Sequence, residues 1–146
     1  MSSIEFHNNG VIDSLTHAPA PAIFLEILKR EHARYSRSAK PISVISLSIQ
    51  LGAPPKNDYS LEQRLIDMTR RIRREMRSDE TFCRISEYGF WVVINGNFDD
   101  AEAVAQRIVN YVGSENAQTW RIIVSECVPG LSCDDWISEL DRVHFC

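Results

Sequence analysis

The chain has 146 residues, the size of one domain with a single continuous core. Hydrophobic residues make up 44% and charged residues 25%, which is typical of a globular protein, and the net charge of −4 argues against general attraction to nucleic acid or anionic lipid. No apolar stretch is long enough for a membrane span, and the N-terminus "MSSIEFHNNG" lacks the pattern of a secretory signal. We therefore expect a cytoplasmic protein that binds neither membrane nor nucleic acid.

The first third of the chain predicts a lead-in, a helix and a strand. Residues 1–12 show little periodicity and are interpreted as a flexible lead-in. Apolar residues at helical spacing from Ile23 predict a helix that ends near Ser38. The β-branched run "ISVISLSIQL" predicts a strand over 42–51, and the proline-rich stretch 52–60 predicts a loop.

The rest of the chain predicts a hairpin and three further helices. The stretch from Ser60, the predicted N-cap, to residue 80 has one apolar stripe and is the clearest helix. Two strands at 81–86 and 90–94 form a hairpin, followed by a helix over 98–112, a strand over 119–128 and a helix over 133–145. This order predicts an α/β fold of the α+β sandwich type, in which helices flank a central, mostly antiparallel sheet.

Neither the cysteines nor the histidines form a recognisable site. No C-x-x-C pair and no zinc-ligand spacing is present, so we expect free thiols, no metal site and no cofactor. None of the four histidines forms a recognisable pattern with a nucleophile or an acid, and we assign none a catalytic role. The acids Asp67, Glu75, Asp79 and Glu80 lie in and around the run "RRIRREMR", and its arginines lack aromatic neighbours, which favours a solvated helix face over a nucleic-acid site. Trp91, Trp120 and Trp136 are expected to pack in the core or at its edge rather than to bind a ligand.

Five segments in chain order resemble the GGDEF family, the diguanylate cyclase domains of bacterial cyclic-di-GMP signalling. They are "DSLTHAPAPAIF", "KPISVISLSIQL", "RSDETFCRISEYGFWVVI", "DDAEAVAQRIVNYV" and "ISELDRVHF". The resemblance implies a nucleotidyl-cyclase-like fold over residues 13–146, with 1–12 as the lead-in. Members of the family usually follow a sensor or receiver domain, so the chain is either a piece of a longer protein or a stand-alone domain.

The resemblance also implies the chemistry that this chain has lost. Members of the family join two GTP molecules, using carboxylates on the first strand and in the hairpin to hold divalent cations. The first-strand acids align with Ser48 and Gln50, which are poor ligands for a hard cation. The five signature positions are Ser86, Glu87, Tyr88, Gly89 and Phe90. The guanine-binding loop is also altered, with only Asn57 and Asp58 echoing its Asn-Asp pair. We therefore expect no catalytic residues and no cyclase activity.

One family site partly survives. An R-x-x-D motif, which binds cyclic-di-GMP in many members, is here Arg77 to Glu80, and Arg107 aligns with an arginine that completes the site in some of them. Arginine can contact guanine O6 and N7, and an acid can accept from the guanine ring N–H. The alternative is a solvated ion pair between Arg77 and Glu80 at a helix end.

These observations lead to two functional hypotheses. The first is a catalytically inactive, degenerate GGDEF domain that acts as a regulatory protein-interaction module, with homodimerisation expected by analogy to the paired active relatives. The second is a receptor that binds cyclic-di-GMP at Arg77, Glu80 and Arg107, or GTP in the altered cleft. No residue pattern supports an enzyme with different chemistry.

Overall fold

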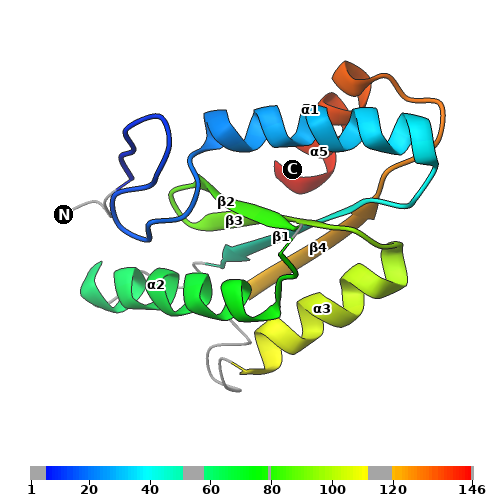
Figure 1. The fold of residues 1–146 in the computed structure, drawn as a ribbon. Coiled ribbons are helices and arrows are strands. Elements are labelled where there is room, and N and C mark those ends of the chain that lie inside the picture. The colour runs from blue at the N-terminus through cyan, green and yellow to red at the C-terminus, as the bar shows by residue number, and fades with distance from the viewer. Residues whose placement is uncertain (1–5, 51–57, 79, 112–119, 146) are drawn as a thin grey trace.

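The computed structural model describes residues 6–50, 58–78, 80–111 and 120–145, which form helices on both sides of a four-stranded sheet (Figure 1). The helices are α1 (Pro21–Ser38), α2 (Asp58–Glu75), α3 (Phe98–Tyr111) and α5 (Cys133–Phe145). The strands are β1 (Ser43–Ile49), β2 (Thr81–Ser86), β3 (Gly89–Ile94) and β4 (Trp120–Glu126). The predicted order of elements is confirmed.

The sheet has the strand order β2-β3-β1-β4, and every neighbouring pair is antiparallel. β1 lies in the middle, paired with β3 on one side and β4 on the other. β2 and β4 are the outer strands. The predicted antiparallel α+β fold is therefore confirmed, and the register places Ser48 of β1 directly opposite Gly89 of β3.

Alternation along β1 divides the core into two layers, because successive side chains of a strand point to opposite faces. Ile45 and Leu47 pack with α2 and α3, whereas Val44 packs with α1 and α5. Figure 1 shows α1 and α5 on one face of the sheet and α2 and α3 on the other. All three tryptophans are at most 6% exposed, which confirms their predicted packing role.

Several predicted boundaries are wrong. α2 begins at Asp58, so Ser60 lies inside the helix and is not its N-cap, and residues 58–60 are helical rather than loop. β1 ends at Ile49 and β4 at Glu126, two residues before the predicted ends of these strands. The loop prediction for 52–57 lies outside the described residues.

Cys83 and Cys127 are buried free thiols that pack in the core layer between the sheet and the α1–α5 helices. Burial raises the pKa of both thiols, that of Cys127 to about 11, so neither is a reactive thiolate at neutral pH. Cys133 is half-buried and also a free thiol.

Residues 6–20 form a loop with its own hydrogen bonds. The N–H of Asp13 donates to the carbonyl of Ala18, and the N–H of Ala20 donates to the carbonyl of Val11, both at 2.8 Å. The loop lies beside the start of α1 (Figure 1). The domain boundary between residues 12 and 13 stays a prediction. Among the described residues, no helix combines the length and apolar character needed to cross a membrane.

Candidate functional site

The β2–β3 hairpin ends in a two-residue turn made of Glu87 and Tyr88. Ser86 pairs with Gly89 across the turn, and the register of β2 shifts between Arg84 and Ser86. Neither turn residue has a positive φ, so this is not the type I′ turn that best matches the twist of a hairpin. Between these pairs β2 has one residue more than β3, Ile85, as in a β-bulge, and this extra residue accounts for the register shift.

Gly89 lies where a side chain has no free space. A Cβ atom added to Gly89 would be 3.0 Å from Ser86 Oγ, 3.3 Å from Ser48 Cβ and 3.4 Å from the carbonyl oxygen of Leu47. The distances to the two serines are tighter than ordinary van der Waals contact. The serine at one end of the turn and the glycine at the other therefore fit together as a pair.

A pocket of about 150 Å³ lies on the α1–α5 face of the sheet beside this turn. Its lining residues come from all four strands and the end of α5: Ser46, Leu47, Ser48, Ile85, Ser86, Gly89, Phe90, Trp91, Arg121, His144 and Phe145. None of the residues that line it carries a carboxylate. The polar groups are hydroxyls, an imidazole and a guanidinium, which are poor ligands for Mg²⁺.

The other predicted positions of this region lie outside the pocket. Gln50 is exposed and follows the end of β1, Glu87 is half-buried in the turn, and Tyr88 packs its ring against the α2–α3 core. Asn57 lies outside the described residues, and Asp58 opens α2. Across the described part of the chain, no group of three or more His, Cys, Asp or Glu side chains is arranged to hold a metal ion.

Replacing Gly89 by alanine is expected to destabilise the protein by about 1–3 kcal/mol, because the new methyl group crowds Ser86 and Ser48. Adding Ser86→Gly should recover part of this loss, since it removes the closest contact. Urea unfolding of the wild type, both single variants and the double variant measures the coupling. Strictly additive effects would contradict the paired packing of residues 86 and 89.

The sequence did not predict the buried ion pair that holds the hairpin. Arg84 is 0% exposed and Asp13 is 1% exposed, and Arg84 Nη1 lies 3.1 Å from Asp13 Oδ1. Asp13 Oδ2 also accepts from the N–H and the hydroxyl of Thr16, both at 2.8 Å. The signal was present, because an arginine between Cys83 and Ile85 in an apolar strand needs a buried partner.

Arg84 also holds the turn itself. Its Nη2 donates to the carbonyl oxygen of Glu87 at 2.8 Å, and its guanidinium lies 4.9 Å from the ring centroid of Phe6. One side chain thus connects the hairpin tip to the N-terminal loop. We expect this contact to hold the turn in position.

The three residues predicted to bind cyclic-di-GMP lie around one cleft. Arg77, Glu80 and Arg107 line a volume of about 210 Å³ between the end of α2, the end of β3 and α3. Three segments far apart in the sequence therefore meet where the resemblance predicted a site.

Two of these three side chains already have partners within the protein. Glu80 Oε1 accepts from the main-chain N–H of Arg77 at 2.9 Å, and its Oε2 accepts from that of Asn95 at 3.0 Å. Arg107 Nε donates to Glu75 Oε2 at 3.0 Å. Glu80 thus accepts from the main chain of Arg77, a contact that differs from the side-chain ion pair named as the alternative.

His144 lies in a network that the sequence also did not reveal. Its Nδ1 is 2.8 Å from Ser46 Oγ and its Nε2 is 2.8 Å from Ser125 Oγ, so both ring nitrogens have hydroxyl partners. The side chain is 6% exposed, and burial lowers its pKa to about 4. A neutral, fixed ring connects the end of α5 to β1 and β4.

Comparison with known proteins finds likeness in structure. No protein-family model matches the chain, and no curated protein sequence matches it. The GGDEF domain of DgcB from Caulobacter crescentus, solved in complex with c-di-GMP, has a TM-score of 0.77 and 16% identity over 95% of this chain and 90% of that chain. The FimX GGDEF domain from Pseudomonas aeruginosa has a TM-score of 0.73 and 16% identity, covering 92% and 91% of the two chains.

A longer protein shares the same fold. Diguanylate cyclase SiaD from Pseudomonas aeruginosa, solved in complex with its activator SiaC, has a TM-score of 0.69 and 18% identity over 92% of this chain. The chain spans 56% of the SiaD chain. The chain, with its antiparallel sheet between two helical layers, has the fold of the GGDEF domains.

Proposed function

We propose that the chain is a catalytically inactive GGDEF-like domain that acts in the cytoplasm as a protein-interaction module of cyclic-di-GMP or related signalling. The observation that carries the proposal is the pocket beside the hairpin, where Ser48, Ser86 and Gly89 meet without a carboxylate. Joining two nucleoside triphosphates needs divalent cations to neutralise phosphate charge and to activate the attacking hydroxyl. The hydroxyl groups found here do not bind such cations firmly.

Incubation of the purified chain with GTP and Mg²⁺ or Mn²⁺ is expected to give no cyclic-di-GMP, because the pocket lacks anionic ligands. Liquid chromatography with mass detection measures the product. An active diguanylate cyclase assayed in parallel shows that the conditions support turnover. Metal-dependent formation of cyclic-di-GMP by this chain would contradict the proposal.

The interaction role is supported by what a domain of this fold can do without chemistry. SiaD was solved bound to an activator protein, which shows that a protein containing this fold can form a stable complex with a partner. The proposal is tested by capturing partners on the full chain and reconstituting each complex from purified components. Light scattering of the chain alone determines whether it also forms a homodimer.

A cyclic-di-GMP receptor is the second candidate. Arg77, Glu80 and Arg107 line one cleft, and DgcB and a further GGDEF domain with a TM-score of 0.76 were solved with this nucleotide. A guanine base would have to compete with Glu75 for Arg107 and with two main-chain N–H groups for Glu80. These internal contacts favour the interaction module.

Isothermal titration calorimetry with cyclic-di-GMP separates the two candidates. If the cleft is a receptor site, Arg77→Ala should weaken binding about tenfold or more, because a charge-assisted contact to guanine is lost. Arg37→Ala, an exposed arginine at the end of α1, is the matched control. Absence of binding by the wild type would eliminate the receptor and leave the interaction module.

A further inference from the structure

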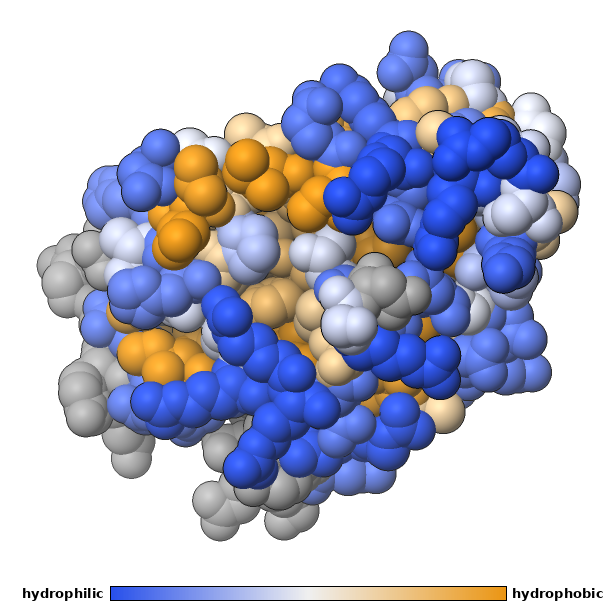
Figure 2. All heavy atoms as spheres, in the orientation of Figure 1, coloured by the Kyte–Doolittle hydropathy of each residue, from blue (hydrophilic) through white to orange (hydrophobic). Residues whose placement is uncertain are grey.

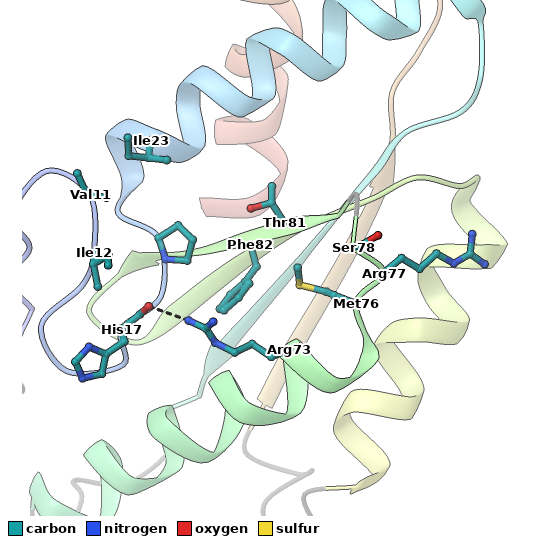
Figure 3. Close-up of a pocket in the computed structure, with 11 residues that line it drawn as sticks. Val11, Ile12, His17, Ile23, Arg73, Met76, Arg77, Ser78, Thr81 and Phe82 are labelled. Atoms are coloured by element: carbon teal, nitrogen blue, oxygen red, sulfur yellow. Dashed lines mark hydrogen bonds between the residues drawn. The ribbon is translucent and has the colours of Figure 1, made fainter.

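A groove between α1 and α2 shares Arg77 with the cleft described above and otherwise has different lining residues. Figure 3 shows it bordered by the N-terminal loop and the start of α1 on one side and by the second half of α2 on the other, with β2 as its floor. Its volume is about 550 Å³, within the range of ligand pockets in proteins. Its apolar lining residues are Val11, Ile12, Pro19, Ile23, Met76 and Phe82.

The upper border of the groove exposes apolar side chains. Val11 is 52% exposed and Ile12 is 43% exposed, although both belong to a hydrogen-bonded loop. Figure 2 shows hydrophobic residues gathered over the N-terminal loop and the start of α1, above a hydrophilic band over α2. Apolar side chains that cluster at a concave surface, rather than scatter singly, are typical of an interaction site.

The charge at the groove is positive. Arg73 Nη2 donates to the carbonyl oxygen of His17 at 2.8 Å, and its guanidinium carbon lies 5.3 Å from the centroid of the Phe82 ring (Figure 3). None of the residues that line the groove is acidic. A second arginine, Arg77, also lines it, but its guanidinium points away from the other lining residues (Figure 3).

This charge pattern selects among occupants. A ligand with carboxylates would complement Arg73, whereas a second copy presenting the same groove would bring two Arg73 side chains together and repel. The floor of the groove also restricts what kind of ligand fits. Thr81 and Phe82 lie on β2, an edge strand of the sheet. An edge strand directs alternate main-chain groups outward, and an extended peptide can pair with them.

We propose that this groove binds an extended segment of a partner protein that carries bulky apolar side chains next to acidic ones. The apolar side chains would enter between Ile12, Ile23 and Met76, and a carboxylate would meet Arg73. The proposal rests on the proposed function as an interaction module and assigns it a surface and a class of partner.

A random dodecapeptide library displayed on phage and selected on the full chain provides the probe. Enriched peptides are expected to combine acidic residues with Leu, Ile, Phe or Trp. Fluorescence polarisation with an enriched peptide should show that Ile12→Ser weakens binding about tenfold, since a buried isoleucine contributes that much. Arg73→Gln should also weaken peptide binding. The loss of affinity should be larger at low salt than at high salt, because salt screens the interaction between charges.

Val128→Ser is the matched control, because Val128 is 56% exposed but lies after β4, outside the groove. It should leave peptide affinity unchanged. Circular dichroism checks that each variant is folded, and amide chemical shifts of Thr81 and Ile23 should move on peptide binding to the wild type.

Four outcomes would overturn the inference: no enriched peptide, enriched peptides that are basic, peptide binding that is insensitive to Ile12→Ser and Arg73→Gln, or a preference for anionic lipid vesicles over peptides. The proposed function is tested separately. If a reconstituted partner binds the Ile12→Ser and Arg73→Gln variants as tightly as the wild type, the interaction role stands and the groove assignment fails.

Discussion

Replacing Arg84 by methionine is expected to lower the free energy of unfolding by about 3–5 kcal/mol, because it leaves the carboxylate of Asp13 buried without its counter-charge. Asp13 is 1% exposed, so water cannot replace the guanidinium. The two hydrogen bonds from Thr16 to Asp13 Oδ2 remain, but they do not neutralise the charge. Urea or thermal unfolding followed by circular dichroism measures the loss.

Arg70→Met is the matched control for this substitution. Arg70 also has an acidic neighbour, Asp67, at 3.7 Å, but the two side chains are 73% and 53% exposed. An exposed pair of this kind contributes about 0–1 kcal/mol. The double variant Arg84→Met with Asp13→Leu should recover part of the loss, since it removes both charges. A loss for Arg84→Met no larger than for Arg70→Met would contradict the role of the buried pair.

The same substitution should loosen the hairpin tip more than the rest of the sheet. Arg84 is the donor to the Glu87 carbonyl and the contact between the turn and the N-terminal loop. Amide hydrogen exchange is therefore expected to rise in residues 86–90 relative to β4. Equal acceleration in both regions would indicate global destabilisation alone.

The fold was largely predictable because local patterns specify it. Apolar spacing identifies the helices, and β-branched runs identify β1 and the hairpin, without any long-range information. The start of α2 was misplaced because Asp58 and Ser60 are both residue types that favour a helix N-terminus, so local preference does not separate them. Strand ends also depend on where pairing with neighbours stops.

The contacts within the site were less predictable because they join distant residues. Asp13 and Arg84 meet only once the N-terminal loop lies beside β2, and no spacing rule places it there. The resemblance to the GGDEF family predicted that Arg77, Glu80 and Arg107 belong to one site, and the structure places them around one cleft. Neither the resemblance nor the spacing revealed that Arg107 donates to Glu75 and that Glu80 accepts from the N–H of Asn95.

The buried ring of His144 is expected to make stability depend on pH in the acidic range. Burial lowers its pKa from an ordinary value of 6.5 to about 4. A lowered pKa means that the folded state resists protonation of the ring. The stability that this gives is therefore fully present above pH 6.5 and is lost as pH falls toward 4. A difference of this size corresponds to roughly 3 kcal/mol.

His144→Gln removes the titrating group while keeping a polar side chain near Ser46 and Ser125. We expect this variant to be less stable than the wild type at pH 7, and the gap to narrow by up to about 3 kcal/mol as pH is lowered to 4, because only the wild type bears the cost of protonation. Urea unfolding at a series of pH values measures both curves. His7→Gln, at an exposed position of the N-terminal loop, should follow the wild-type curve. A difference in the free energy of unfolding between His144→Gln and the wild type that stays constant at all pH values would contradict this prediction. It would show that folding does not hold the ring neutral.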